Sequence, residues 1–408
     1  MHRMLESPAN GKNTADKKNI ISRKKRGCLF AIAAPIIFLG CAELIFRIFF
    51  GHGYWELPVE LINRPLFNFY WNSWTYSGSK QIRTPVLVED RYLFWRLAPN
   101  TMATIYEDKE DQARPAHHIY PVITNSMGLR SPEIPIVKTE NTYRIACLGD
   151  SATFGYGLPE SFTYSRKLEQ ILNSRYPDFN FEVINAGVVG YSSLQGRVLF
   201  EKTILGLKPN LITLCFGAND VVKWKRSDAW RYQKRQGWLA GFTFALMRIK
   251  LFQWLRFHIL GFPVKLGINL DKTGLSPRVG DDEFFDNYRA IANKAREHGI
   301  DAMVLERYLQ APFTNMIDHK VALRLGIPFI PTQAPLKAAM DKIVAGELFP
   351  EVQSYYRSKY AKALDANPYY YVLLDFGHPT PLGNEIIAEE IFKSLNSAPG
   401  FEAFIHGR

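Results

Sequence analysis

The chain has 408 residues, 47% hydrophobic and 22% charged, a near-average globular composition that excludes a disordered, collagenous or coiled-coil protein. Its net charge of +11 is concentrated in two segments, because residues 1–26 carry +6 and residues 221–262 carry +8. The remainder is slightly acidic, which excludes a uniformly basic nucleic-acid-binding surface, so we expect no nucleic-acid partner. The four cysteines form no CxxC pair and are too few for a disulfide scaffold.

The first segment with a clear pattern is an apolar stretch, residues 27–50, interrupted only by Glu43 and Arg47. As a helix it would be about 36 Å long, enough to cross a hydrocarbon core of about 30 Å. The sequence therefore predicts one N-terminal transmembrane helix. Because a basic run, residues 23–26, directly precedes it, the positive-inside rule places residues 1–26 in the cytoplasm as a basic tail. We expect a single-pass protein of the cell membrane, with its main domain on the extracytoplasmic side of a bacterial membrane.

Two alternatives to a retained anchor are open. Gly40 and Ala42 form a small-x-small pair before Glu43, as at the cleavage site of a signal peptide. Gly40-Cys41 is also similar to the end of a lipid-attachment box. The apolar stretch continues to Phe50 and the basic tail is long, which favours the retained anchor. All three alternatives leave most of the chain outside the cytoplasm.

Residues 51–142 are rich in Trp, Tyr and Pro and show neither a helical nor a strand period. We expect an irregular lead-in that packs on the main domain. The adjacent residues His117 and His118 would point to opposite faces of an extended chain. They have no acidic or cysteine partner nearby, so we expect no metal site there.

From Tyr143 onward, short apolar runs alternate with amphipathic stretches, a pattern typical of a parallel α/β sheet. We expect strands at 144–148, 181–185, 211–216, 302–305 and 371–374, with 328–330 as a weaker sixth, and helices at 162–175, 193–205, 283–298 and 382–395. Cys147 and Cys215 fall within these strands and are expected to be small apolar core residues.

Polar and glycine-rich blocks follow four of the predicted strands. They are Gly149-Asp150-Ser151, the segment from Asn185 through Gly187 to Gly190, Gly217-Ala218-Asn219-Asp220, and Asp375-Phe376-Gly377-His378. The carboxyl ends of parallel strands meet at one edge of a sheet, where open α/β folds bind their ligands. We therefore expect the four blocks to form one site.

In this order the four blocks resemble those of the SGNH hydrolase superfamily, the GDSL-type esterases, over about residues 143–395. The resemblance implies a three-layer α/β/α sandwich with a mostly parallel, flavodoxin-like sheet. The hydrolase domain would span residues 143–398 and contain an insertion at 221–282. Ahead of it, residues 125–130 look like a segment often found before the domain in anchored members.

Ester chemistry needs a hydroxyl nucleophile and a base, and His is the natural base near neutral pH. We assign Ser151 as the nucleophile, His378 as the base and Asp375 as the group that orients the imidazole ring. The resemblance further implies an oxyanion hole formed by the backbone N–H groups of Ser151 and Gly187 and the side-chain amide of Asn219. Asp150 precedes the nucleophile, and we expect it to support the turn.

No cofactor is expected, because the sequence Gly155-Tyr156-Gly157 has Glu160 where a dinucleotide loop would place its third glycine. The sequence predicts an exported, membrane-anchored serine esterase that hydrolyses a small ester, an acylated glycan or a lipid through an acyl-enzyme. Two alternatives are an O-acyltransferase acting on an envelope glycan or lipid, and a non-catalytic binding or assembly protein on the same fold. The absence of a GxSxG elbow disfavours an α/β-hydrolase.

The insertion contains four of the eight tryptophans and most of the second positive segment. Residues 239–262 are too polar for a second membrane span, because Arg248, Lys250 and Arg256 would each cost about 2.5–3.5 kcal/mol at its centre. Three interpretations are open: a lid against the membrane surface formed by residues 221–262, a cap whose charges are solvated, and a binding surface for an anionic substrate.

Overall fold

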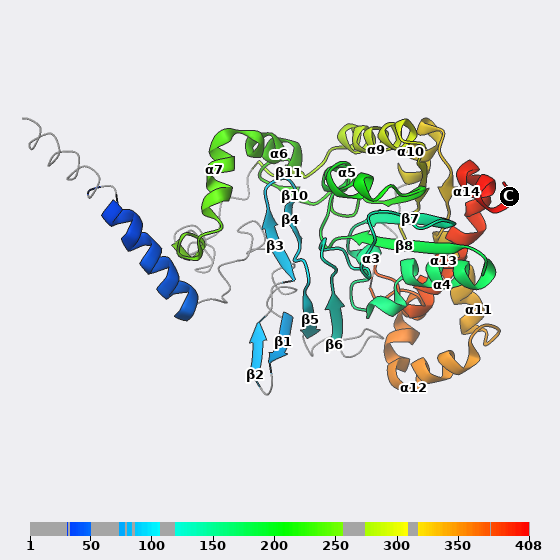
Figure 1. Cartoon of the computed structure of the whole chain (residues 1–408). Coiled ribbons are helices and arrows are strands. Elements are labelled where there is room, and N and C mark those ends of the chain that lie inside the picture. The colour runs from blue at the N-terminus through cyan, green and yellow to red at the C-terminus, as the bar shows by residue number, and fades with distance from the viewer. Residues whose placement is uncertain are drawn as a thin grey trace, which may run out of the picture.

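The structure, a computed structural model, describes residues 31, 33–49, 73–77, 80–83, 86–106, 119–255, 274–308, 317–375 and 377–407. Near the N-terminus, residues 31 and 33–49 are helical and extend away from the body of the molecule (Figure 1). Across the described ranges, no helix is both long enough and apolar enough to cross a membrane. The basic tail and residues 27–30, 32 and 50 of the predicted span lie outside the described residues, so the predicted anchor stays a prediction.

The central sheet has five parallel strands in the order β13-β12-β9-β7-β8. Their bounds are β7 Thr142–Gly149, β8 Asn180–Gly187, β9 Leu211–Cys215, β12 Asp301–Leu305 and β13 Phe329–Ile330. Numbered along the chain from β7, the spatial order is 2-1-3-4-5, that of flavodoxin-like doubly wound sheets. The predicted parallel α/β fold is confirmed, and the weak sixth strand is real.

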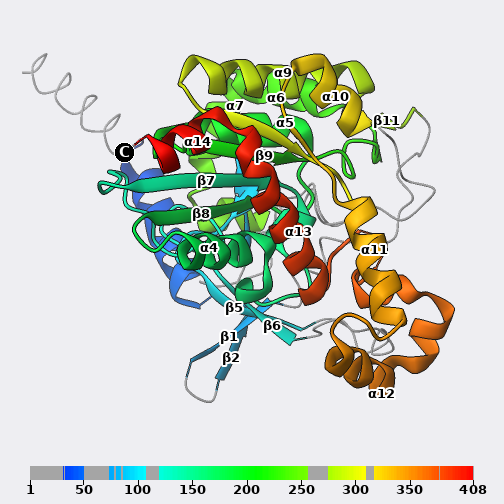
Figure 2. The same ribbon diagram turned by 90° about the vertical axis from the view of Figure 1, so that its right-hand side faces the viewer.

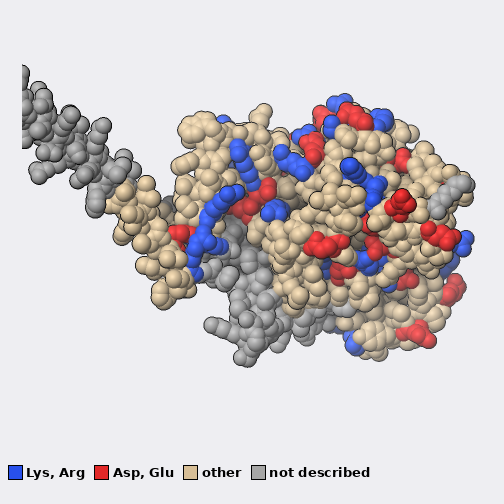
Figure 3. Space-filling model, in the orientation of Figure 1, with Lys and Arg blue, Asp and Glu red and all other residues tan. Residues whose placement is uncertain are grey.

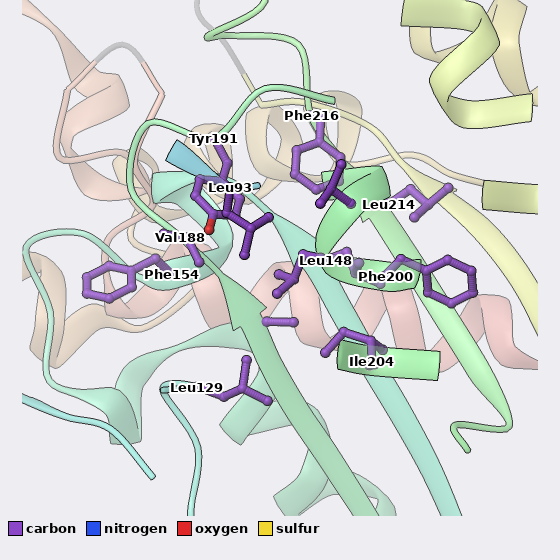
Figure 4. Packing of buried hydrophobic residues seen from close by; sticks show 14 of the residues in the cluster. Leu93, Leu129, Leu148, Phe154, Val188, Tyr191, Phe200, Ile204, Leu214 and Phe216 are labelled. Carbon is purple, nitrogen blue, oxygen red and sulfur yellow. The ribbon is translucent and has the colours of Figure 1, made fainter. Parts of the chain in front are cut away.

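Side chains of β7 alternate between two cores, one on each face of the sheet. Ile145 and Cys147 belong to the core covered by α4 (Tyr164–Arg175) and α13 (Pro381–Ser394). Leu148 belongs to the core covered by α5 (Ser193–Leu199) and α9 (Asp281–Glu297). Figures 1 and 2 show the two helical layers on opposite sides of the sheet, and Figure 4 shows the packing of the second core. The two strand cysteines, Cys147 and Cys215, are buried as predicted.

The remaining helices complete the layers and the periphery. They are α3 Ser151–Phe154, α6 Asp228–Gln236, α7 Trp238–Leu246, α10 Ile317–Leu325, α11 Gln333–Val344, α12 Pro350–Ala366 and α14 Pro399–His406. Helix α5 continues as a π-helical segment, Phe200–Ile204, and a 3₁₀ turn, Leu205–Leu207. Further 3₁₀ turns are Glu160–Phe162, Pro368–Tyr371 and Leu395–Ser397.

The predicted strand at residues 371–374 is wrong. A 3₁₀ turn ends at Tyr371, and the following residues form only one antiparallel bridge, between Leu373 and Pro379. The turn is set by Pro368, which fixes its own φ, and by Asn367, whose side chain accepts a 3.2 Å hydrogen bond from the Tyr369 N–H. A short run of four buried apolar residues is typical of a strand but also fits a buried loop.

The lead-in is not irregular, as the sequence had indicated. Its strands form a four-stranded antiparallel sheet in the order β2-β1-β5-β6 and a separate hairpin of β3 and β4. The bounds are β1 Ser73–Ser77, β2 Lys80–Arg83, β3 Leu87–Asp90, β4 Phe94–Leu97, β5 Met102–Tyr106 and β6 Ile119–Ile123. The predicted packing on the main domain is confirmed: Trp95 is buried and its Nε1 donates to the Val189 carbonyl at 3.0 Å. Residues 117–118 lie outside the described residues.

The insertion starts and ends in a short antiparallel pair, β10 (Lys223–Trp224) and β11 (Ser276–Pro277). Between these strands lie α6, α7 and a helical turn at residues 250–255, whereas residues 256–273 are not described. Figure 1 shows α6 and α7 on the side of the molecule from which the N-terminal helix extends.

Candidate active site

The first strand of the sheet, β7, leads directly into the helix that carries Ser151. Asp150 is the N-cap of this helix, α3, and its Oδ1 accepts a 3.0 Å hydrogen bond from the Ala152 N–H. The helix ends after one turn at Gly155, which has φ of 81°, a left-handed conformation that glycine adopts without strain. Ser151 is therefore the first residue of a short, capped helix at the carboxyl edge of the sheet.

His378 and Asp375 lie together on the loop before α13. Asp375 Oδ1 accepts hydrogen bonds of 2.8 Å from the backbone N–H groups of Gly377 and His378. Its other oxygen, Oδ2, is 2.7 Å from His378 Nδ1. A 2.6 Å hydrogen bond from the Leu374 N–H to the His378 carbonyl closes the loop. One carboxylate thus holds both the backbone and the imidazole ring of the histidine.

The tertiary structure brings Ser151 and His378 together, although 227 positions separate them in the chain. Ser151 Oγ lies 2.8 Å from His378 Nε2. In a neutral imidazole whose Nδ1–H donates to Asp375, Nε2 is the acceptor for the serine hydroxyl. The ring is also packed against Tyr156, with 4.9 Å between the ring centroids. This is the arrangement in which a serine can transfer its proton to histidine as it attacks a carbonyl.

Electrostatics keep the orienting carboxylate charged. Burial alone would raise the pKa of Asp375, but the charge of His378 and three hydrogen bonds outweigh it and lower this pKa to about 2. Asp375 is consequently an acceptor at every pH at which the imidazole could act as a base. It can therefore fix the ring orientation and stabilise the imidazolium that forms on proton transfer.

The structure gives Gly187 a different role from the one that the resemblance implied. Its N–H donates a 3.0 Å hydrogen bond to Asn185 Oδ1, so it is not available to an oxyanion in this conformation. Gly187 instead provides space, because a Cβ there would collide with the backbone of Thr153 and Phe154 in the nucleophile helix. The Ser151 N–H is at the first position of α3, where helical N–H groups have no intrahelical acceptor.

The second glycine of the same block, Gly190, was not selected from the sequence. It has φ of 80°, and within the described part of the chain no hydrogen bond from its N–H is found. Gly190 is therefore a candidate donor in the block, as is Val189, whose N–H likewise has no hydrogen bond within the described residues. The signal in the sequence is the glycine itself, since turns that expose backbone N–H groups often need a residue at positive φ.

Asn219 lies beside the nucleophile turn. Its Nδ2 donates a 3.2 Å hydrogen bond to Asp150 Oδ2, the carboxylate oxygen that does not cap α3. Asp150 therefore supports the turn and also orients the Asn219 amide, which has a second N–H to offer. Burial raises the pKa of Asp150, while the Ala152 N–H and the charges of His378 and Arg307 partly offset this effect.

Asp220, the last residue of the same block, anchors the next loop. Its carboxylate accepts hydrogen bonds from the N–H and the hydroxyl of Ser193 at the start of α5. Burial raises the pKa of Asp220 to about 7, although the bonds from Ser193 and the charge of Arg278 partly oppose the shift. One buried carboxylate thus joins this block to the start of α5.

Two buried arginines support the site, and neither was selected as a site residue. Arg130, from the lead-in, donates to the carbonyl oxygens of Phe154 and Gly155 at the end of the nucleophile helix. Arg278, from the insertion, donates to the Gly190 carbonyl at 2.7 Å and to Asp228 at 2.8 Å. Arg130 ends the segment 125–130, whose resemblance to a segment found before the domain could have pointed to it, whereas nothing in the sequence around Arg278 distinguishes it.

Metal binding finds no support in the described residues, which contain no group of three or more His, Cys, Asp or Glu side chains that could hold an ion.

Comparison with known proteins extends this picture. Residues 147–386 match the GDSL-like Lipase/Acylhydrolase family, a match that covers more than half of the chain and includes Ser151, Gly187, Asn219, Asp375 and His378. The comparison with curated proteins gives no match.

The similar solved structures have low sequence identity to this chain. A protein of Parabacteroides merdae named for its likeness to GDSL lipases is 14% identical, with 64% of this chain and 99% of that chain covered and a TM-score of 0.38. An acetylxylan esterase of Geobacillus stearothermophilus is 15% identical, with 63% and 96% covered and a TM-score of 0.37. The enzyme LAE5 from the metagenome of Lake Arreo is 16% identical, with 64% and 97% covered and a TM-score of 0.38.

Proposed function

Because the chain belongs to the GDSL-like lipase/acylhydrolase family and is an ester-hydrolysing enzyme, we propose that it hydrolyses a carboxylic ester through an acyl-enzyme formed on Ser151. The observation that carries this proposal is the hydrogen-bonded series Ser151 Oγ, His378 Nε2, His378 Nδ1 and Asp375 Oδ2, with steps of 2.8 Å and 2.7 Å. A nucleophile, a base and an orienting carboxylate in hydrogen-bond reach are what acyl transfer requires.

In the first half of the reaction, Ser151 Oγ attacks the ester carbonyl carbon and its proton passes to His378 Nε2. The tetrahedral oxyanion accepts hydrogen bonds from the Ser151 N–H and the Asn219 amide, with Gly190 as the third donor. When the intermediate collapses, the carbon–oxygen bond to the alcohol breaks and His378 returns the proton to the leaving oxygen. In the second half, water attacks the acyl-serine with the same base and releases the acid.

Covalent labelling tests the nucleophile. A fluorophosphonate probe should label the wild-type protein and leave Ser151→Ala unlabelled, because the reagent phosphonylates an activated serine. Ser358→Ala is the matched control, since this residue is exposed on α12 and should not affect labelling. If the wild type resists the probe under conditions where another serine esterase reacts, the proposal is refuted. p-Nitrophenyl esters of increasing chain length would then define the acyl group.

Kinetics separate the oxyanion donors. Loss of one such donor typically costs about 2.7–4 kcal/mol of barrier, so Asn219→Ala should lower kcat by roughly 10²–10³-fold. Replacing Gly190 by Ala would disturb a backbone at positive φ, so the kinetic test is made on Asn219. Unchanged kcat in Asn219→Ala would refute the assignment of Asn219 as an oxyanion donor.

The proposal includes the membrane. We propose that residues 27–50 anchor the chain, with residues 1–26 in the cytoplasm and the hydrolase domain outside it. The described helical residues support this, because their large apolar side chains are exposed. In intact cells a membrane-impermeant maleimide should label Ser358→Cys more strongly than Ser22→Cys, with the unsubstituted chain as the background control. Labelling of Ser22→Cys alone would reverse the proposed orientation.

A further inference from the structure

Helix α7 of the insertion presents an unusual apolar surface. None of its residues is buried. Trp238, Leu239 and Phe242 have exposed fractions of 79%, 62% and 60%. Single exposed apolar residues are ordinary, but a contiguous group on one short helix marks an interaction site. The question is what covers this surface.

The insertion is joined to the N-terminal helix by specific polar contacts. Glu43 accepts hydrogen bonds from the backbone N–H groups of Lys250 and Leu251, at 2.8 Å and 2.9 Å. Arg47 forms an ion pair with Glu43 at 2.7 Å and donates to the Arg248 carbonyl at 2.8 Å. Glu43 thus serves as a cap for the helical turn that follows α7, and the two segments form one unit.

The N-terminal helix is itself apolar and exposed in this unit. Eight of its large side chains have exposed fractions between 56% and 74%: Ile36, Ile37, Phe38, Leu39, Leu44, Ile45, Ile48 and Phe49. Figures 1 and 3 show this helix and α7 on the same side of the molecule, away from the parallel sheet. The apolar surface of α7 and the segment proposed as the anchor therefore lie on one side of the molecule, linked by the contacts of Glu43 and Arg47.

Basic side chains border this surface. A cavity of about 700 Å³ between the lead-in hairpin and α7 is lined by Arg91, Arg96, Arg248 and Lys250, against only two acidic residues, Glu89 and Asp90. Both acidic residues face arginines, since Asp90 is 3.6 Å from Arg96 and Glu89 is 3.9 Å from Arg235. Figure 3 shows Lys and Arg side chains gathered where the N-terminal helix meets the body. The rim of the apolar surface therefore favours an anionic neighbour.

From these observations we infer that α7 lies in the interface of the bilayer that the N-terminal helix enters. Trp238, Leu239 and Phe242 reach the boundary between headgroups and acyl chains, and Arg248 and its basic neighbours contact anionic headgroups. An apolar helix face rimmed by cations is what an interfacial helix needs, and tryptophan is enriched at this depth. The bilayer is favoured over a protein partner because the surface lies on the same side as the exposed apolar helix, is linked to it by hydrogen bonds and is bordered by positive charge.

This docking also fixes the orientation of the catalytic domain. Asp228, at the start of α6, is bonded to Arg278 and accepts a 2.8 Å hydrogen bond from the Ser192 hydroxyl. Arg278 in turn holds the Gly190 carbonyl. The membrane-facing insertion and the glycine block beside the candidate site are thus connected through buried charged groups.

Fluorescence quenching tests the inference on the full chain. The protein is reconstituted in vesicles of phosphatidylglycerol and phosphatidylcholine with or without brominated acyl chains, since bromine quenches tryptophan on contact. Trp238→Phe should lose part of the bromine-dependent quenching. Trp230→Phe is the matched control: this residue lies on α6 between Arg226 and Lys234, and its removal should leave the quenching unchanged. Equal quenching in wild type and Trp238→Phe would overturn the inference.

The dependence on lipid charge and salt provides a second test of the inference. The Trp238 contribution should decrease in vesicles of phosphatidylcholine alone, and in about 1 M salt, where the Debye length is about 3 Å. Phe242→Asp should abolish the Trp238 contribution, whereas Leu323→Asp, which also places a carboxylate at an exposed apolar position, should not. If the Trp238 contribution is absent and Phe242→Asp instead dissociates a dimer, the surface binds a second copy and the inference is wrong. Fluorophosphonate labelling is independent of all these outcomes, so failure of the docking and failure of the proposed catalysis are distinguishable.

Discussion

Arg130 Nη1 donates a 2.7 Å hydrogen bond to the carbonyl oxygen of Phe154, the last residue of the helix that begins with Ser151. The guanidinium carbon lies 4.4 Å from the Phe154 ring centroid, and the side chain is fully buried. Burial lowers the pKa of Arg130 to about 10, so the group is still charged near neutral pH. A cation at a helix C-terminus is stabilising, and this one comes from the lead-in.

Replacing Arg130 should therefore affect both stability and catalysis. Arg130→Met removes a buried charge and its hydrogen bonds to four carbonyl oxygens, and we expect the free energy of unfolding to fall by about 3 kcal/mol or more. Arg130→Lys retains the charge with fewer donors and should be intermediate. Urea denaturation measures the stability, and kcat at a temperature where the variants are folded measures the positioning of Ser151. Arg289→Met, which removes an exposed ion pair with Asp286, is the control and should change stability by less than about 1 kcal/mol.

The close packing of Gly187 on the nucleophile helix gives a second prediction. A methyl group there would collide with the backbone of Thr153 and Phe154, and overpacking typically costs about 1–3 kcal/mol. Gly187→Ala should therefore destabilise the protein and displace Ser151, lowering kcat. Gly206→Ala is the matched control, because nothing lies within 4 Å of its added Cβ. Equal stability of the two variants in urea would contradict the tight contact.

The orienting role of Asp375 can be tested by an isosteric change. Asp375→Asn removes the charge that holds His378, and we expect kcat to fall by roughly 10³–10⁴-fold. Asp341→Asn, which alters an exposed pair with Lys337, should leave kcat unchanged.

The pH dependence of kcat/KM should follow from the contact between Asp375 and His378. Because the pKa of Asp375 is lowered to about 2, the carboxylate stays ionised above pH 4 and the acid limb of kcat/KM should report only the imidazole. The stability that this carboxylate contributes is present above its unfolded pKa and is lost as pH falls toward 2. An acid limb near pH 4 would show that Asp375 titrates instead.

Asp220 should produce the opposite pH dependence of stability. Its pKa is raised to about 7, so between about pH 4 and pH 7 the folded state binds more protons than the unfolded state. The free energy of unfolding should accordingly decrease as pH rises through this window. Asp220→Asn retains an oxygen acceptor for Ser193 but does not titrate. The free energy of unfolding is measured for both proteins at pH 4.5 and 7.5. Between these two pH values the wild type should lose more stability than Asp220→Asn.

The pattern of apolar residues along the sequence identified most strands of the parallel sheet. Apolar runs such as Ile145 to Leu148 predicted strands because strands covered on both faces of a sheet are mostly apolar. It failed where an apolar run was short, as at residues 371–374, since burial alone does not separate a strand from a loop. It also missed the lead-in strands, whose aromatic and proline-rich sequences show no alternation.

The sequence by itself determined the chemical groups: Ser151, Asp375 and His378 are set by residue type and by the order of their blocks, although only the Ser151 block directly follows a strand. Only the tertiary structure decided which atoms meet, because hydrogen bonds depend on distances between segments far apart in the chain. It directed the Gly187 N–H to Asn185 and set Arg130 behind the nucleophile helix. It also joined the apolar N-terminal helix to the positively charged insertion, through Glu43 and the backbone N–H groups of Lys250 and Leu251. Net charge is a sum over residues, whereas a contact is a property of geometry.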